Sequence, residues 1–127
     1  MSVRTQFADG LPRAQGDRAQ LQQVMLNLIV NAIQAMKDVA EGARELQISI
    51  DAVPSEGGVR VGVQDTGPGL NPESLSRLFE PFYTTKPEGM GMGLSICRAI
   101  IEAHGGRLWA TGCEPQGALF EFTIPAD

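Results

Sequence analysis

Hydrophobic residues recur in the N-terminal part of the chain with the period of an α-helix. Between residues 17 and 40 an apolar side chain returns every three or four positions, and Asp17 precedes this pattern as an N-cap residue would. The residues of the predicted buried stripe are Leu21, Val24, Met25, Leu28, Ala32, Ala35 and Met36. We expect the helix to end between Val39 and Gly42, where the periodic pattern stops.

Alternation of apolar and polar residues predicts strands in several other parts of the chain. The four clearest stretches are residues 45–53, 59–65, 108–111 and 119–124. Residues 3–15 are expected to form a hairpin or an extended arm, because alternation there leads into the turn pair Asp9-Gly10.

A second helical pattern covers residues 94–104 and stops at Gly105. We expect residues 72–78 to form a short helix and residues 81–93 to form a loop. Paired strands between helices are typical of an α+β sandwich. In such a fold a mostly antiparallel sheet carries its helices on one face.

The composition is that of a single globular domain, which we place at residues 1–127. The chain is 43% hydrophobic and 20% charged, and it contains no run of about 18 apolar residues that would span a membrane. Lysine and arginine are scattered along a chain of net charge −5, which argues against nucleic acid as a partner. The start lacks the apolar segment of a secretory signal, and two cysteines are too few for a disulfide framework. A cytoplasmic setting is therefore expected.

The polar side of the long predicted helix is rich in amides. Its residues are Gln20, Gln23, Asn27, Asn31, Gln34 and Asp38. Asn27 and Asn31 are one turn apart and share a face, although asparagine is a poor residue for a helix interior. Two interpretations stay open: an ordinary solvated face, or neutral oxygen ligands suited to Mg²⁺ together with water and phosphate oxygens.

The segment DTGPG follows a valine-rich strand and ends it with glycines. Asp65 stands at the strand end, where its carboxylate can accept a hydrogen bond from an adenine amino group. Gly67 and Gly69 would leave room for the ring. A tight turn capped by Asp65 is the alternative interpretation.

Three alternating glycines, Gly89, Gly91 and Gly93, precede the second helix at Leu94. Free backbone N–H groups at a helix start, next to flexible glycines, are suited to binding phosphate. Lys86 lies in the same segment and can reach a terminal phosphate, with a solvated loop lysine as the equal alternative. The spacing matches neither the dinucleotide fingerprint nor the P-loop.

Four motifs, taken in order, resemble the catalytic ATP-binding domain of a bacterial two-component sensor histidine kinase. LQQVMLNLIVNAIQAM is similar to its N box, DTGPGL to the G1 box, LFEPFYTTK to the F box and GMGMGLSICRAIIEAHGG to the G2 box. The resemblance covers residues 4–125. It implies the ATP-binding fold shared with gyrase, the Hsp90 chaperones and MutL, known as the Bergerat or GHKL fold. This is a two-layer α/β sandwich in which a mixed five-stranded sheet lies beneath three helices.

The resemblance also implies roles for individual residues. Asn31 would hold the Mg²⁺ that bridges the phosphates, Asn27 would lie beside the triphosphate, and Asp65 would bind the adenine amino group. The implied nucleotide contacts are Asn27, Asn31, Asp65, Gly67, Gly69, Lys86, Gly89, Gly91, Gly93 and Leu94. Asn27 and Asn31 would be the catalytic residues. Hydrolysing relatives carry a glutamate in the place of Asn27, and an amide cannot act as a general base, which favours transfer over hydrolysis.

The implied activity is that of a protein-histidine kinase fragment. Such a domain binds Mg²⁺–ATP and donates the γ-phosphoryl group to a histidine on a separate dimerisation domain, from which it passes to a response regulator. Alone, the fragment is expected to be monomeric, to turn over poorly and to make no direct membrane contact, whether or not its parent is tethered to a membrane. Three alternatives stay open: a serine kinase of the anti-sigma-factor type, a degenerate module that binds nucleotide without transferring phosphate, and a structural hairpin-and-helix domain with no ligand.

Two further residues are expected to be structural. His104 is interpreted as a helix C-terminal residue favoured by the helix dipole, because its IIEAHGG context belongs to the G2 box and not to a phosphoacceptor helix. Cys97 is expected to be a small side chain facing the core.

Overall fold

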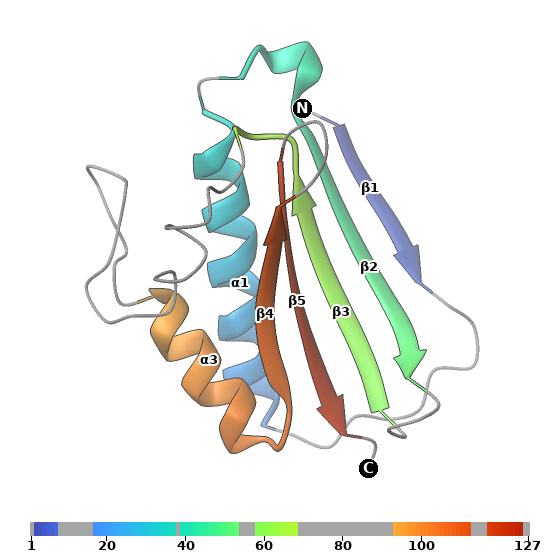
Figure 1. Cartoon of the computed structure of the whole chain (residues 1–127), viewed down its shortest axis with the longest axis vertical. Helices are drawn as coiled ribbons and strands as arrows, with labels where there is room; N and C mark the ends of the chain where they lie inside the picture. Colours follow the sequence, from blue (N-terminus) through green and yellow to red (C-terminus); the bar gives the residue numbers. More distant parts are fainter. Residues whose placement is uncertain are drawn as a thin grey trace.

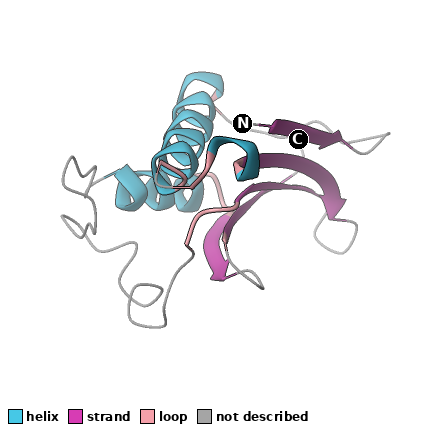
Figure 2. Ribbon diagram, turned by 90° about the horizontal axis from the view of Figure 1, so that it is seen from above, coloured by secondary structure: helices cyan, strands magenta, loops and turns pink. Residues whose placement is uncertain are grey.

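The computed structural model describes residues 2–7, 17–37, 39–53, 58–68, 93–112 and 117–125. Within these ranges, two α-helices cover one face of a five-stranded sheet (Figures 1 and 2). The helices are α1 (Arg18–Ala35) and α3 (Gly93–Ala103), and a 3₁₀ turn, η1, covers Glu41–Ala43. The strands are β1 (Ser2–Phe7), β2 (Glu45–Val53), β3 (Gly58–Asp65), β4 (Arg107–Gly112) and β5 (Ala118–Pro125). Neither helix is long and apolar enough to cross a membrane.

The sheet is mixed, with the strand order β1-β2-β3-β5-β4. β1 runs parallel to β2, whereas the other three neighbouring pairs are antiparallel. A parallel pair needs a crossover connection, and α1 lies in the connection between β1 and β2. The predicted α+β sandwich with a mixed, mostly antiparallel sheet is confirmed. Three helices were expected; the described ranges hold two, and the expected helix at residues 72–78 lies outside them.

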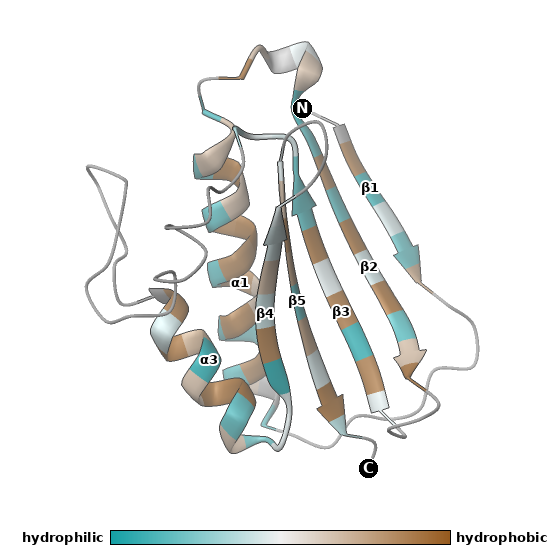
Figure 3. Cartoon of the chain, in the orientation of Figure 1, coloured by the Kyte–Doolittle hydropathy of each residue, from teal (hydrophilic) through white to brown (hydrophobic). Residues whose placement is uncertain are grey.

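The core lies between the helices and the face of the sheet that they cover. α1 and β5 each present one apolar stripe to this interior, as the alternating bands on β5 in Figure 3 indicate. The buried members are Val24, Leu28, Ala32 and Met36 on α1 and Ala118, Phe120, Phe122 and Ile124 on β5. The predicted strands 45–53, 59–65, 108–111 and 119–124 all lie within observed strands. Local alternation therefore identified the four strands β2 to β5.

The N-terminal segment forms an edge strand. β1 pairs in parallel with residues 45–50 of β2, which agrees with an extended arm, and residues 8–15 of the expected hairpin lie outside the described residues. The guanidinium of Arg4 lies 3.3 Å from the carboxylate of Glu45 across this pair. The Arg4 side chain is largely exposed and that of Glu45 is partly exposed, so water screens the pair and it contributes little to stability.

The C-terminal end of α1 differs from the prediction. The helix ends at Ala35, not between Val39 and Gly42. Arg44 donates from Nε to the carbonyl of Val39 at 2.7 Å and from Nη2 to the carbonyl of Lys37 at 2.8 Å. Because this side chain binds carbonyls that follow the helix, the chain can turn early without burying unpaired acceptors.

His104 joins the two helices at their ends. The backbone N–H of Asp17 donates to Nε2 of His104 at 2.9 Å, and Nδ1 of the same ring lies 2.7 Å from the carbonyl of Ile100. Since Nε2 accepts, the ring proton is on Nδ1 and donates to Ile100. Asp17 in turn caps α1 as predicted, because its Oδ1 accepts from the N–H of Gln20 at 3.0 Å. The end of α3 thus holds the residue that starts α1.

We predict that His104→Ala lowers the free energy of unfolding by about 1 kcal/mol, because the Asp17 N–H loses its acceptor. Urea denaturation measures this loss, and hydrogen exchange should show faster opening of the first turn of α1. Glu102→Ala is the matched control on the same helix. It removes only an exposed ion pair with Arg98 and should change stability by less than about 0.5 kcal/mol. Equal effects of the two substitutions would contradict the role of His104.

Candidate functional site

Asp65 ends β3 in the interior of the protein. Asp65 is only 1% exposed, and its Oδ1 accepts a hydrogen bond from the backbone N–H of Gly67 at 2.8 Å. Burial of a carboxylate is costly unless hydrogen-bond donors offset the lost hydration. Oδ2 is buried as well and can accept a bond from a donor placed against the strand end. The two interpretations of the sequence are therefore compatible, since one oxygen caps the turn and the other is suited to an amino group.

The loop that follows β3 is held against the end of α1. The hydroxyl of Thr66 accepts from the N–H of Glu45 at 3.0 Å and donates to the carbonyl of Ala43 at 2.8 Å. Gly67 lies so close to α1 that a Cβ at this position would be 2.6 Å from the carbonyl oxygen of Ala35. A residue with a side chain would push the loop away from the helix.

Gly117, which the sequence analysis did not single out, lies next to the backbone carbonyl of Asp65. Its φ is +107°, and a Cβ there would be 2.3 Å from the carbonyl oxygen of Asp65. Ala118, the next residue, pairs with Asp65 across β3 and β5. The start of β5 can therefore approach the end of β3 only because residue 117 is glycine. The one sequence signal was its place directly before an apolar alternation.

Asn27 is buried in the seam between α1 and α3. Asn27 is 9% exposed. Its Oδ1 accepts a hydrogen bond from Nε2 of Gln23 at 2.9 Å, and its Nδ2 donates a hydrogen bond to Sγ of Cys97 at 3.5 Å. The amide stripe of α1 is thus not a uniform solvated face, because Gln23 is exposed and Asn27 is not. Cys97 is completely buried, which confirms its predicted place in the core.

The first residues of α3 lie at the same end of the α1–α3 interface as Asn31. Asp17 contacts His104 near one end, and Asn27 contacts Cys97 further along, so the two helices run antiparallel (Figure 1). Asn31 is half-buried and lies one turn beyond Asn27, in the direction of the first residues of α3. Gly93 and Leu94 are those first residues. The fold thus brings Asn31 and Gly93, the last of the three G2 glycines, to the same end of the interface between α1 and α3.

Four of the predicted site residues lie outside the described residues. They are Gly69, Lys86, Gly89 and Gly91.

The described donor set suits a nucleotide with a divalent cation. A buried carboxylate and two amides offer hydrogen-bond acceptors and hard oxygen ligands. Gly67 and Gly117 let α1 and the start of β5 approach the end of β3 closely. In the ranges that the structure describes, no group of three or more histidine, cysteine, aspartate or glutamate side chains could hold a metal ion. A cation here would take most of its ligands from phosphate and water, as Mg²⁺ commonly does.

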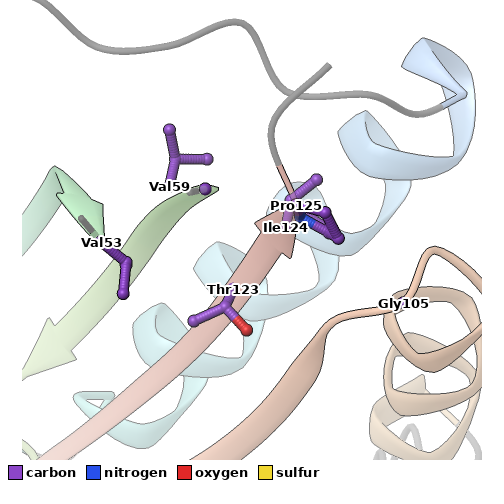
Figure 4. A pocket seen from close by; sticks show the side chains of 7 residues that line it. Val53, Val59, Gly105, Thr123, Ile124 and Pro125 are labelled. Carbon is purple, nitrogen blue, oxygen red and sulfur yellow. The ribbon is translucent and has the colours of Figure 1, made fainter. Parts of the chain in front are cut away.

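A small cavity lies beside Gly58, which begins β3, whereas Asp65 ends that strand. Figure 4 shows the residues that line the cavity. Its volume is about 90 Å³, and its lining residues are Val53, Gly58, Val59, Gly105, Thr123, Ile124 and Pro125. None of these seven residues carries an ionisable side chain. The cavity therefore offers no candidate for acid–base chemistry or metal binding.

Comparison with known protein families gives one family model that matches most of the chain. Residues 16–127 match the model described as histidine kinase-, DNA gyrase B-, and HSP90-like ATPase. Among relatives, the sensor histidine kinase TmoS of Ectopseudomonas mendocina is 42% identical over 125 residues, which is 98% of this chain and 13% of TmoS. The sensor protein FixL of Bradyrhizobium diazoefficiens is 42% identical over 126 residues, covering 99% of this chain and 24% of FixL. The chain thus spans a minor part of the relatives that it matches.

Solved structures give the same result for the fold. The nucleotide-free catalytic domain of histidine kinase ThkA superposes with a TM-score of 0.85 at 36% identity, covering 98% of this chain and 78% of that one. Full-length ShkA in complex with AMPPNP superposes with a TM-score of 0.82 at 33% identity, over 98% of this chain and 25% of ShkA.

We predict that Gly67→Ala lowers the free energy of unfolding by about 1–3 kcal/mol, because the new Cβ meets a backbone carbonyl that cannot swing aside. Gly42→Ala is the matched control, since nothing lies within 4 Å of a Cβ at that position. The control should differ from the wild type by less than about 0.5 kcal/mol in urea denaturation. Wild-type stability of the Gly67 variant would disprove the close approach to α1.

Proposed function

The chain belongs to the family of histidine kinase-, DNA gyrase B- and HSP90-like ATPases, and on this premise we propose that it is the Mg²⁺–ATP-binding catalytic domain of a sensor histidine kinase. It binds ATP and supplies the γ-phosphoryl group to a histidine on a separate dimerisation domain. The observation that carries the proposal is the buried Asp65 carboxylate, which is fixed at a strand end between two close-packed glycines.

Asp65 is the residue that recognises the adenine base. An ionised carboxylate only accepts hydrogen bonds, so it selects a purine that presents an amino group, as adenine does, over one that presents a carbonyl. In this proposal Gly67 and Gly69 border the base. The buried position of the carboxylate supports this role, because a hydrogen bond to a charged group is strongest where water is excluded.

The amides of α1 and the start of α3 face the phosphates. Asn31 is the proposed ligand of Mg²⁺, which neutralises charge on the phosphate oxygens when it is bound. Asn27 lies beside the triphosphate and can donate its second Nδ2 proton to a phosphate oxygen. Gly89, Gly91, Gly93 and Leu94 supply backbone N–H groups and the hinge of the lid, and Lys86 contacts the terminal phosphate.

The acceptor histidine belongs to another domain. His104 is the one histidine of the chain, and both of its ring nitrogens are bound to backbone groups, those of Asp17 and Ile100. Asn27 cannot activate water as a base, so the domain retains the phosphoryl group until an imidazole reaches it. Positioning and charge stabilisation contribute most of the catalysis in such a transfer. In this proposal Asp65, Asn27 and Asn31 position the nucleotide.

A response regulator is the proposed final acceptor. Histidine kinase ThkA has been solved in complex with the response regulator TrrA, and it superposes on this chain with a TM-score of 0.80 at 34% identity. That match covers 98% of this chain and 34% of ThkA. A cytoplasmic location is part of the same proposal.

We predict that Asp65→Asn weakens binding of a non-hydrolysable ATP analogue by about 10- to 100-fold, because the adenine amino group loses a charged acceptor. Calorimetric titration in the presence of Mg²⁺ measures the change. Asparagine keeps an oxygen for the Gly67 N–H, so the fold is expected to persist. Asp51→Asn, a change on β2 away from the site, is the control and should bind like the wild type. Unchanged affinity in the Asp65 variant would exclude the adenine role, and a folded wild type that binds no analogue would exclude a nucleotide site.

We predict that Asn31→Ala abolishes the dependence of ATP binding on Mg²⁺, because the amide oxygen that anchors the cation is removed. Titrations with and without Mg²⁺ should then give affinities within about twofold of each other. The same variant should fail to transfer radiolabelled phosphate from ATP to an isolated histidine-containing dimerisation domain. Gln22→Ala, on an exposed position of α1, is the control. Transfer by the wild type to serine in place of histidine would favour the anti-sigma-factor type of kinase. Binding without transfer would favour a degenerate module.

A further inference from the structure

Three side chains form a continuous polar chain across the seam between α1 and α3. Gln23 donates to Oδ1 of Asn27, and Asn27 donates from Nδ2 to the sulfur of Cys97. The two contacts fix both ends of the amide, because the oxygen faces a donor and the nitrogen faces an acceptor. Gln23 lies one turn before Asn27 on the same helix, whereas Cys97 is 70 residues away in sequence.

The two partners of Asn27 differ in how firmly they are held. Gln23 is exposed, and a glutamine side chain has many rotamers to lose when it is fixed. Cys97 is 0% exposed, has one side-chain rotor and is packed in the core beside Ile101. The sulfur is therefore the rigid partner, and it sets the position of the nitrogen end of the amide.

The state of the thiol agrees with an acceptor role. Burial raises the pKa of the Cys97 thiol above its usual value, and the hydrogen bond from Asn27 opposes this only in part. The sulfur is thus neutral near pH 7, and its lone pairs accept from the amide without a buried charge.

From this geometry we propose that Cys97 is a positioning residue, whose sulfur holds the Asn27 amide with its remaining N–H directed out of the seam, where a phosphate oxygen is expected. The inference rests on the proposed nucleotide site. A valine or leucine at position 97 would fill the same space in the core but would leave the amide nitrogen without its fixed acceptor. The identity of this core residue therefore bears on ligand affinity as well as on packing.

The matched pair Cys97→Ser and Cys97→Ala separates the two roles. Both substitutions shrink the side chain, and they differ by one oxygen atom that can accept from Nδ2 of Asn27. If the contact positions Asn27, the alanine variant binds a Mg²⁺-loaded ATP analogue about three- to tenfold more weakly, and the serine variant stays within about twofold of the wild type. Ile101→Val, one turn further along the buried face of α3, controls for loss of core volume and should bind like the wild type.

A double-mutant cycle with Asn27→Ala assigns the effect to the pair. In the Asn27→Ala background, Cys97→Ala should cause no further loss of affinity, because the group that it positions is gone. Equal losses from Cys97→Ala with and without Asn27 would overturn the proposal. So would equal losses in the serine and alanine variants, since both results assign Cys97 a packing role alone.

A second measurement tests the contact without any nucleotide. The side-chain NH₂ signals of Asn27 in a ¹⁵N-resolved NMR spectrum report directly on its hydrogen bond and its exchange with water. Cys97→Ala should shift these signals and speed their exchange at least tenfold, whereas Cys97→Ser and Ile101→Val should leave both close to the wild type. Unchanged signals in the alanine variant would refute the inference. If the wild type binds no ATP analogue but the NMR result is as expected, the proposed function fails and the hold of Cys97 on Asn27 stands.

Discussion

α1 packs against the sheet and against α3 with adjacent sides of one helix, and the rest of the structure depends on this constraint. Its apolar stripe, which includes Val24 and Leu28, packs against the sheet. A helical stripe is narrow, so Asn27 lies directly beside it and α3 packs over that side. An amide in such a seam has to keep its hydrogen bonds, and Gln23 and Cys97 provide them. The packing that forms the core therefore also orients the polar groups that we propose face the nucleotide.

Much of the fold could be predicted from the sequence because local patterns determine it. The Asp17 cap, the stripe of α1 and the alternation along β5 each depend on residues close together in the chain. The errors have physical causes of another kind. α1 ends at Ala35 because a side chain beyond the pattern, Arg44, binds the carbonyls that follow it. The parallel pairing of β1 with β2 has no local signature, since it depends on how α1 crosses over the sheet.

The site shows the same division. Asp65, Asn27 and Gly67 could be singled out as candidates because their residue types and their order are specific, and their role in binding stays a prediction. The structure shows where each of them lies. Gly117 was missed because its importance lies in a positive φ and in the carbonyl of a distant strand, neither of which a sequence displays. The partner of Asn27 was missed for a similar reason. Cys97 was correctly placed in the core, but the sequence does not show which polar group donates a hydrogen bond to a buried cysteine.

The strand order also determines when this domain can fold during synthesis. β3 lies between β2 and β5, yet β5 is the last strand to leave the ribosome. Until then β3 has one edge of unpaired backbone, and its valines lack the phenylalanines that cover them in the native core. Such an edge is a template for aggregation, and contacts between distant segments also form slowly. A ribosome that stalls within β4 therefore leaves a chain in which the edge of β3 that pairs with β5 is open to other strands.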